Sequence, residues 1–369
     1  MITKHYASTE FITGLRALAV LMVFMIHSGG GGLVELFQYG ERVVSLGKYG
    51  VDIFFVISGF TIFFQIYEKK YRMKNFILLR LARISIPYFP LIIALYVYVL
   101  YGGEWSNYWL DTLTNGEISF TNLMMHLSYF SFLDIRYANT IIGVEWTLSI
   151  EVFYYFLLGF IIIKFRENIG VNILISLFIL TLFFNFLIFY LTRSNEIYQL
   201  YALWMPFRYA YMFLLGGVAY FLRNKIMKKY SEVFQIRISN IILLFFIIIL
   251  LWFSLGINIP KSSLLNELFF TFFTFILLTT IHDKAFLSKL FLRNRMFIFL
   301  GSISFSFYLY HMLVLNLPIF AIEIDNIFIK FLYYLILTIV ISMFSYLVFE
   351  RKGYLLVKKK LIEENVNVY

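Results

Sequence analysis

Residues 14 to 32 read GLRALAVLMVFMIHSGGGG, an apolar run that also carries two groups penalised by lipid, Arg16 and His27. The run is long enough to cross a hydrocarbon core about 30 Å thick. The two residues are eleven positions apart, which places them on nearly one face of a helix, roughly 16 Å apart along its axis. Arg16 could simply extend to lipid phosphates while His27 makes a structural hydrogen bond. The alternative is a cleft through a helix bundle, with a charged anchor near one end and a titratable base near the other.

The composition of the whole chain is that of a membrane protein. Of 369 residues, 61% are hydrophobic, 21% are aromatic and only 14% are charged, and the mean hydropathy is +0.82. A soluble chain of this length needs far more polar surface. The chain contains no cysteine, which excludes disulfides and thiolate metal sites, and we expect no metal. The net charge of +10 does not indicate nucleic-acid binding, because the basic residues stand in short loops between apolar runs.

These apolar runs predict an all-α polytopic membrane protein, a bundle of about ten transmembrane helices. The predicted spans are 12–29, 46–67, 84–101, 141–163, 170–191, 201–222, 240–256, 264–281, 296–320 and 328–349. Of the 31 Lys and Arg residues, 23 lie in one alternating set of connections, including Lys4, and six lie in the other, including Lys261. The positive-inside rule therefore predicts that both termini are cytoplasmic.

The chain is expected to form a single integral membrane domain over residues 1–369. Spans from about 12 to 349 are followed by a cytoplasmic tail, 350–369, and no C-terminal soluble esterase-like domain is expected. Residues 119–133 are too short to span and predict an interfacial or re-entrant helix. The first span superficially resembles a cleaved signal peptide, but its flank is barely basic and the later spans need no separate signal.

Further polar groups inside the predicted spans favour one shared cavity. A carboxylate in the bilayer costs at least a few kcal/mol unless it is paired or hydrated. Any single group could be a structural hydrogen bond between helices, whereas many on different helices indicate a common polar space. We expect Glu145 to be hydrated near the outer surface, and Glu151 to need a partner. The groups are Asp52, Ser58, Glu145, Glu151, Arg208, Ser302, Ser304, Ser306, Tyr308, Tyr310 and His311.

Arg80 and Arg83 in RLARISIPYFP stand one helical turn apart and predict a single cationic patch. Guanidinium groups at this spacing suit the phosphate oxygens of a lipid or a cofactor. The alternative is ordinary positive charge at the inner end of a span.

Several blocks resemble the membrane-bound acyltransferase family 3. GLRALAVLMVFMIH resembles the signature of its first span, an Arg and a His separated by ten residues. GVDIFFVISGF, RLARISIPYFP, WTLSIEVFYYFLLG and GSISFSFYLYHMLV resemble later blocks in the same order, while FRYAYMFLLGGVAY and FSYLVFE are weaker matches. The resemblance extends from Phe11 to about Glu350. The departures are Thr147 where Ser is common, Tyr310 where Trp is usual, and the missing Pro after Glu350.

The resemblance implies a ten-span inner-membrane protein that transfers an acyl group, usually acetyl from acetyl-CoA, to a sugar hydroxyl bound for the cell surface. It implies functional roles for Arg16 and His27, phosphate or CoA contact for Arg80 and Arg83, and an acidic role for Glu151. The expected cofactor-binding residues are Arg16, Arg80 and Arg83, and the expected substrate-binding residues are Arg208, Ser58, Trp146, Tyr310 and His311.

Acyl transfer from a thioester needs a base, and His27 is the natural candidate because imidazole titrates near neutral pH. Glu151 or Asp52 would orient its ring, as a carboxylate does in a catalytic triad. A covalent acyl-His27 intermediate stays open.

The sequence thus predicts transfer of an acyl group across a bacterial inner membrane to a hydroxyl of a surface polysaccharide or lipid-linked glycan. The expected partners are membrane lipids, an acyl-CoA co-substrate and the glycan acceptor, with no nucleic acid, and the oligomeric state stays open. The alternative is a transporter or flippase of a glycan or lipid-linked precursor, which also needs charges within the membrane. Its typical pattern, paired interrupted helices in two related halves, is not evident in this sequence.

Overall fold

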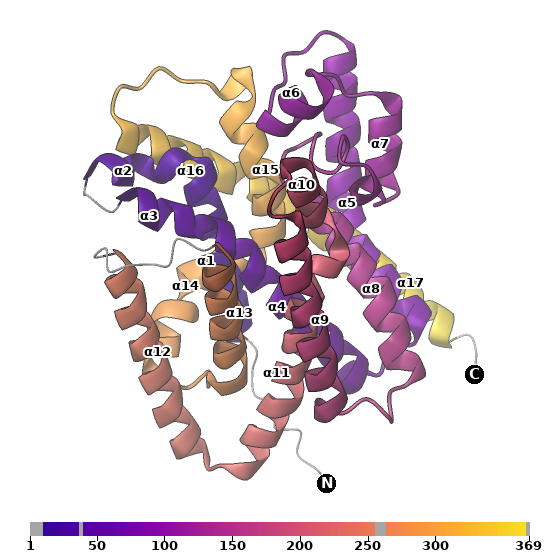
Figure 1. Cartoon of the computed structure of the whole chain (residues 1–369), viewed down its shortest axis with the longest axis vertical. Coiled ribbons are helices and arrows are strands. Elements are labelled where there is room, and N and C mark those ends of the chain that lie inside the picture. Colours follow the sequence, from indigo (N-terminus) through magenta and orange to yellow (C-terminus); the bar gives the residue numbers. More distant parts are fainter. Residues whose placement is uncertain (1–9, 37–39, 255–262, 367–369) are drawn as a thin grey trace.

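The computed structural model describes residues 10–36, 40–254 and 263–366, and its regular elements there are all helices (Figure 1). Lys4 and Lys261 of the predicted loop charges lie outside the described residues. The α-helices are α1 Glu10–His27, α2 Leu33–Leu36, α3 Gly40–Ser45, α4 Gly50–Lys69, α5 Met73–Leu100, α6 Tyr108–Thr114, α7 Phe120–Leu127, α8 Trp146–Lys164, α9 Val171–Thr192, α10 Glu196–Trp204, α11 Ala210–Lys229, α12 Glu232–Ser254, α13 Ser263–Thr280, α14 Arg295–Ser302, α15 Ser304–Asn316, α16 Ile327–Ser345 and α17 Lys352–Val366.

The all-α, multi-pass membrane architecture is confirmed, but a total of ten spans is not. Seven of the described helical segments are long and apolar enough to cross a membrane, and the pair α14–α15 would make an eighth. Every predicted span overlaps a helix, yet 201–222 is divided between α10 and α11 by a turn at Pro206–Tyr209. Proline lacks the N–H that a continuous helix needs there. The orientation of the termini stays a prediction.

Helix α1 lies at the centre of the part that carries polar residues. It packs against α4, α14 and α15, while α8 packs against α4 and α5. By contrast, only 17% of the apolar window of α9 is buried within the protein. Large apolar side chains on such a helix suit contact with lipid tails. Most polar residues of the predicted spans lie on α1, α4, α8 and α15.

The four glycines after α1 explain where this helix ends. Gly29, Gly30, Gly31 and Gly32 all have positive φ, at 72°, 78°, 60° and 84°. Only glycine adopts this region readily, so the chain turns sharply at once. His27 consequently occupies the last position of α1.

The described part of the predicted tail, residues 350–366, continues the last span as a helix. Helix α16 runs through a π-helical segment, Tyr346–Arg351, into α17, which packs against α5. This brings Glu350 next to Arg83. Within the predicted interfacial segment 119–133, the structure has the short helix α7 and a 3-10 turn, Ser131–Leu133. Its location at a membrane surface stays a prediction.

Candidate active site

Three cavities lie in a row along α1, and we name each by its main feature. The arginine cavity has a volume of about 420 Å³ and is lined by Arg16, Arg80 and Arg83. The central cavity, about 70 Å³, shares Arg16 and Arg83 with it. The histidine cavity, about 150 Å³, is lined by His27 and shares Val51 and Tyr308 with the central cavity. The row therefore runs from the first turns of α1 to its last residue.

Two of the three arginines have partners in the protein. Arg80 is only 3% exposed, and it donates to the hydroxyl of Tyr155 at 3.4 Å and to that of Thr61 at 3.2 Å. Arg83 lies 3.7 Å from a carboxylate oxygen of Glu350. The prediction that Arg80 and Arg83 form one patch agrees with their shared lining of the arginine cavity.

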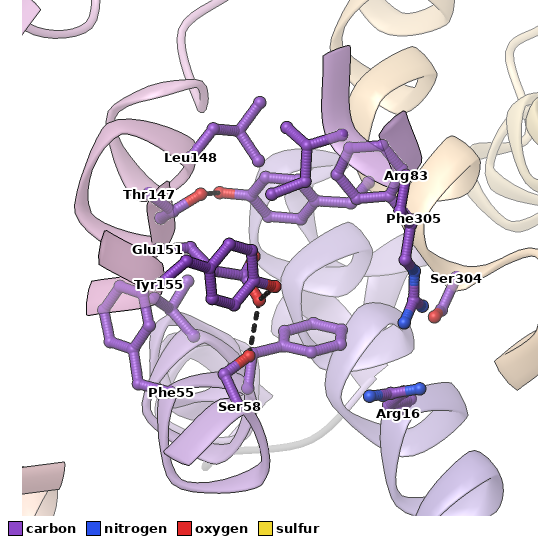
Figure 2. Close-up of a pocket in the computed structure, with 14 residues that line it drawn as sticks. Arg16, Phe55, Ser58, Arg83, Thr147, Leu148, Glu151, Tyr155, Ser304 and Phe305 are labelled. Atoms are coloured by element: carbon purple, nitrogen blue, oxygen red, sulfur yellow. Dashed lines mark hydrogen bonds between the residues drawn. The ribbon is translucent and has the colours of Figure 1, made fainter. Parts of the chain in front are cut away.

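Arg16 makes no hydrogen bond or ion pair with any residue that the structure describes. Figure 2 shows its side chain and that of Arg83 extending toward one side of the central cavity, with Glu151 and Ser58 opposite. A guanidinium without a protein partner is a ready donor to phosphate or carboxylate oxygens. The three arginines that line this cavity therefore suit an anionic ligand.

Glu151 of α8 is held inside the central cavity by two hydroxyl groups. Ser58 of α4 donates to its carboxylate at 2.6 Å, and Tyr155 donates to the same oxygen (Figure 2). Apolar side chains, among them Phe54, Phe305 and Leu148, complete the wall. Ser58, predicted to bind substrate, is thus placed in the cavity, as is Glu151.

The histidine cavity combines aromatic walls with polar groups. Trp109 and Trp146 line it together with Lys48, and the side chain of His27 is exposed to it. Asn139 is 2% exposed and donates to the carbonyl of Gly143 at 2.8 Å. Its amide oxygen has no hydrogen-bond partner within the described part of the chain.

The partner of His27 is a second histidine rather than a carboxylate. Its Nδ1 lies 3.0 Å from Nε2 of His311, a residue of α15 that is fully buried. The prediction that Glu151 or Asp52 orients His27 does not agree with this geometry. Glu151 lines the central cavity, which His27 does not line.

Asp52 and Arg208 belong to a separate buried cluster. Arg208 forms an ion pair of 2.8 Å with Glu267 of α13, and Tyr211 donates to the other carboxylate oxygen of Glu267 at 2.6 Å. Asp52 lies within the electrostatic reach of this pair. None of these four residues lines any of the three cavities. The predicted roles of Asp52 as a catalytic group and of Arg208 as a substrate contact therefore gain no support from their positions.

The remaining predicted substrate contacts are also separated by the fold. Trp146 lines the histidine cavity. Tyr310 lines none of the three cavities and lies near Ser345 of α16. His311 stands behind His27 without reaching the cavity wall.

Glu145 is buried, contrary to the expectation that water hydrates it. It is 0% exposed and accepts from the backbone N–H groups of Ile141 at 2.7 Å, Gly143 at 2.7 Å and Val144 at 2.9 Å. The carboxylate folds back from the start of α8 and fixes the loop that lines the histidine cavity. Burial lowers the pKa of the neighbouring His126 in α7, while the Glu145 charge opposes that shift.

Several lining residues were not identified from the sequence. Lys48, Trp109 and Asn139 line the histidine cavity but are not among the site residues that the sequence predicts. Glu350 was noted only as the end of a weakly matching block. The sequence does carry a signal for Trp109 and Asn139, because both stand in the long connection between two predicted spans, 102–140, and connections often carry binding residues.

A comparison with protein families gives one match. A family model described as an acyltransferase domain matches residues 9–349, which include every residue that lines the central and histidine cavities. Neither the curated proteins nor the solved structures that were compared give a match. Since the family match covers most of the chain, this protein belongs to the membrane-bound acyltransferase family 3 and is a multi-pass membrane acyltransferase.

Proposed function

We propose that the protein transfers an acyl group, acetyl from acetyl-CoA, across the bacterial inner membrane to a hydroxyl of a surface polysaccharide or lipid-linked glycan. One observation carries this proposal: a row of cavities joins an arginine cluster at one end to His27 at the other. A donor that is anionic at one end and reactive at the other fits such a row.

The arginine cavity suits the phosphates of CoA. Phosphates cannot enter lipid, so they need a charged site at a mouth of the bundle. Arg16 supplies a guanidinium without a protein partner among the described residues, and Arg80 and Arg83 line the same cavity. The central cavity, about 70 Å³, connects the arginine cavity with the histidine cavity through shared lining residues, and in this proposal the pantetheine arm follows that connection.

The histidine cavity suits a carbohydrate acceptor. Trp109 and Trp146 offer aromatic surface to the apolar faces of a sugar, while Lys48 offers a polar contact. Such a mixture of apolar walls and few polar groups is typical of small-molecule sites. In the orientation predicted by the positive-inside rule, this cavity faces the outer side and the arginine cavity faces the cytoplasm.

The proposed reaction is a direct transfer. The imidazole of His27 takes the proton of the acceptor hydroxyl, and the hydroxyl oxygen forms a bond to the thioester carbonyl carbon. The C–S bond then breaks, and the departing CoA sulfur takes up the proton from the imidazolium. A positioned base contributes about 10²–10⁴-fold to such a rate.

Mass spectrometry of surface glycans tests the proposal. Cells with the intact protein should carry an acyl group on one glycan, and cells without the protein should lack it at unchanged glycan amount. Loss of the glycan itself would favour a transporter or flippase instead. Identical acylation in both strains would contradict the proposal.

A further inference from the structure

We infer that His311 is a positioning residue that holds His27 in the tautomer protonated on Nδ1, so that the bare Nε2 is left for the histidine cavity. The protonation state follows from the hydrogen bonds and from the burial of His311. Its consequence for catalysis rests on the proposed function.

The backbone carbonyl of Tyr308 determines which nitrogen of His311 is protonated. Nδ1 of His311 lies 2.7 Å from the carbonyl oxygen of Tyr308. A carbonyl oxygen only accepts, so Nδ1 of His311 must carry a proton and donate it. In a neutral imidazole the other nitrogen is then an acceptor. Nε2 of His311 is therefore the acceptor toward His27.

The contact with His311 in turn determines the tautomer of His27. Its Nδ1 lies 3.0 Å from that acceptor nitrogen, so this Nδ1 carries the proton of the shared bond. Nε2 of a neutral His27 is then unprotonated. Among the described residues, the hydrogen-bond partners of the His27 ring are His311 and the backbone of Val23, and the ring lines the histidine cavity, to which it offers the lone pair of Nε2. This is the lone pair that a general base needs.

A doubly protonated His311 would reverse this assignment, but its surroundings disfavour the charge. His311 is 0% exposed, and no carboxylate of the described chain forms an ion pair with it. An imidazolium buried without a compensating charge costs several kcal/mol, roughly. The neutral form of His311 is therefore the one that fits.

In this arrangement the imidazole of His311 takes the place that the carboxylate has in a catalytic triad, and it orients the imidazole of His27. An acceptor on Nδ1 of the base fixes the ring and supports the imidazolium that forms during proton transfer. The ring of His311 is itself fixed by Tyr308, whose hydroxyl donates to the carbonyl of Val144 at 2.7 Å. His311 thus links the base to the loop that Glu145 shapes.

The first test is spectroscopic and needs no substrate. The chain has five histidines, so protein labelled with ¹⁵N-histidine in lipid nanodiscs gives a spectrum simple enough to assign with His27→Asn. The inference expects His27 to show a protonated Nδ1 and an unprotonated Nε2. Unconstrained imidazole prefers the opposite tautomer, so a protonated Nε2 in the wild type would overturn it.

The second test uses matched variants. His311→Leu removes the acceptor and should shift His27 toward the protonated Nε2 form, with kcat lower by roughly 10²-fold or more and the donor KM within about two-fold. His311→Gln offers an amide oxygen to Nδ1 and should restore kcat to within about 10-fold of wild type. His282→Leu, remote from the cavities, should change neither the spectrum nor kcat.

An unchanged His27 tautomer in His311→Leu would overturn the inference. If His311→Leu fails to fold, the wild-type spectrum and the His311→Gln variant still decide it. The spectrum is independent of acyl transfer, so a confirmed tautomer in a protein that transfers no acyl group would contradict only the proposed function.

Discussion

Arg16 and Arg223 are both arginines within helices, but they differ in how the protein satisfies them. Arg223 is 3% exposed and donates to the carbonyl oxygens of Leu278 at 3.1 Å and Ile281 at 2.8 Å. Arg16 has no such partner among the described residues. Arg223 is therefore expected to stabilise the fold, and Arg16 to bind a ligand.

Arg16→Gln should raise the KM for acyl-CoA with little change in stability. Each lost charge-assisted hydrogen bond weakens binding by about 1.5–3 kcal/mol, or roughly 10- to 100-fold. Steady-state kinetics at varied acyl-CoA measure this effect, and thermal melting of the purified protein measures stability. Arg223→Gln is the matched control, and it should lower the melting temperature. A wild-type donor KM in Arg16→Gln would remove Arg16 from the donor site.

His27→Ala should abolish acylation while the amount of protein in the membrane stays normal. The imidazole supplies the base, whereas its exposed position at a helix end contributes little packing, and alanine is favourable in a helix. Glycan acylation and immunoblots of membrane fractions test both parts. His282→Ala is the control. Near wild-type acylation in His27→Ala would show that His27 takes no part in the chemistry.

Glu145→Gln should reduce stability more than Glu151→Gln does. Glu145 accepts three backbone N–H bonds through both oxygens, and the amide nitrogen of glutamine would face some of those donors. Each such bond to a charged group contributes about 1.5–3 kcal/mol. In Glu151→Gln, the amide oxygen can still accept from Ser58 and Tyr155. Melting temperatures in detergent compare the two, and equal values would contradict the structural role of Glu145.

At the scale of elements, the packing of α4 against α11 depends on small residues. A Cβ at Gly216 would lie 2.2 Å from the carbonyl oxygen of Val56, and a Cβ at Gly59 would lie 2.2 Å from that of Phe213. Backbones in membrane proteins approach this closely only where side chains are absent. Since α4 carries Ser58 and Val51, this contact also sets the wall of the central cavity.

Gly216→Ala should therefore destabilise the protein by about 1–3 kcal/mol, the usual cost of overpacking. Gly170→Ala is the matched control, because a Cβ at Gly170 meets nothing within 4 Å. Thermal unfolding of the two purified variants measures the difference. A melting temperature of Gly216→Ala equal to that of Gly170→Ala would mean that α4 and α11 pack less closely than described.

Apolar run length predicted the uninterrupted helices well and the broken ones poorly. The predicted spans 12–29 and 170–191 lie within a few residues of α1 and α9. The span 201–222 failed because hydropathy does not register the break at Pro206. The span 296–320 corresponds to α14 and α15, which pass as one apolar segment but are bent by 74°, a bend that hydropathy does not predict.

At the scale of the whole molecule, the sequence predicted which site residues lie near one another on the same helix. It did not predict contacts between residues that are far apart in the sequence. Spacing along one helix placed Arg80 beside Arg83, and placed Arg16 and His27 at two ends of a path. The contact between His27 and His311 joins residues 284 positions apart, and a single sequence does not show which helices pack together. The ion pair of Arg208 with Glu267 was missed for the same reason.

The central claim is that an acyl group enters from the donor face and reaches an acceptor on the opposite face through His27. Inverted membrane vesicles, which expose the cytoplasmic face and enclose the native acceptor, test it directly when given acetyl-CoA labelled in the acetyl group. The account predicts label on glycan protected inside wild-type vesicles, and none in His27→Ala vesicles. Equal label in both preparations, or label only on glycan exposed to the added acetyl-CoA, would contradict the account.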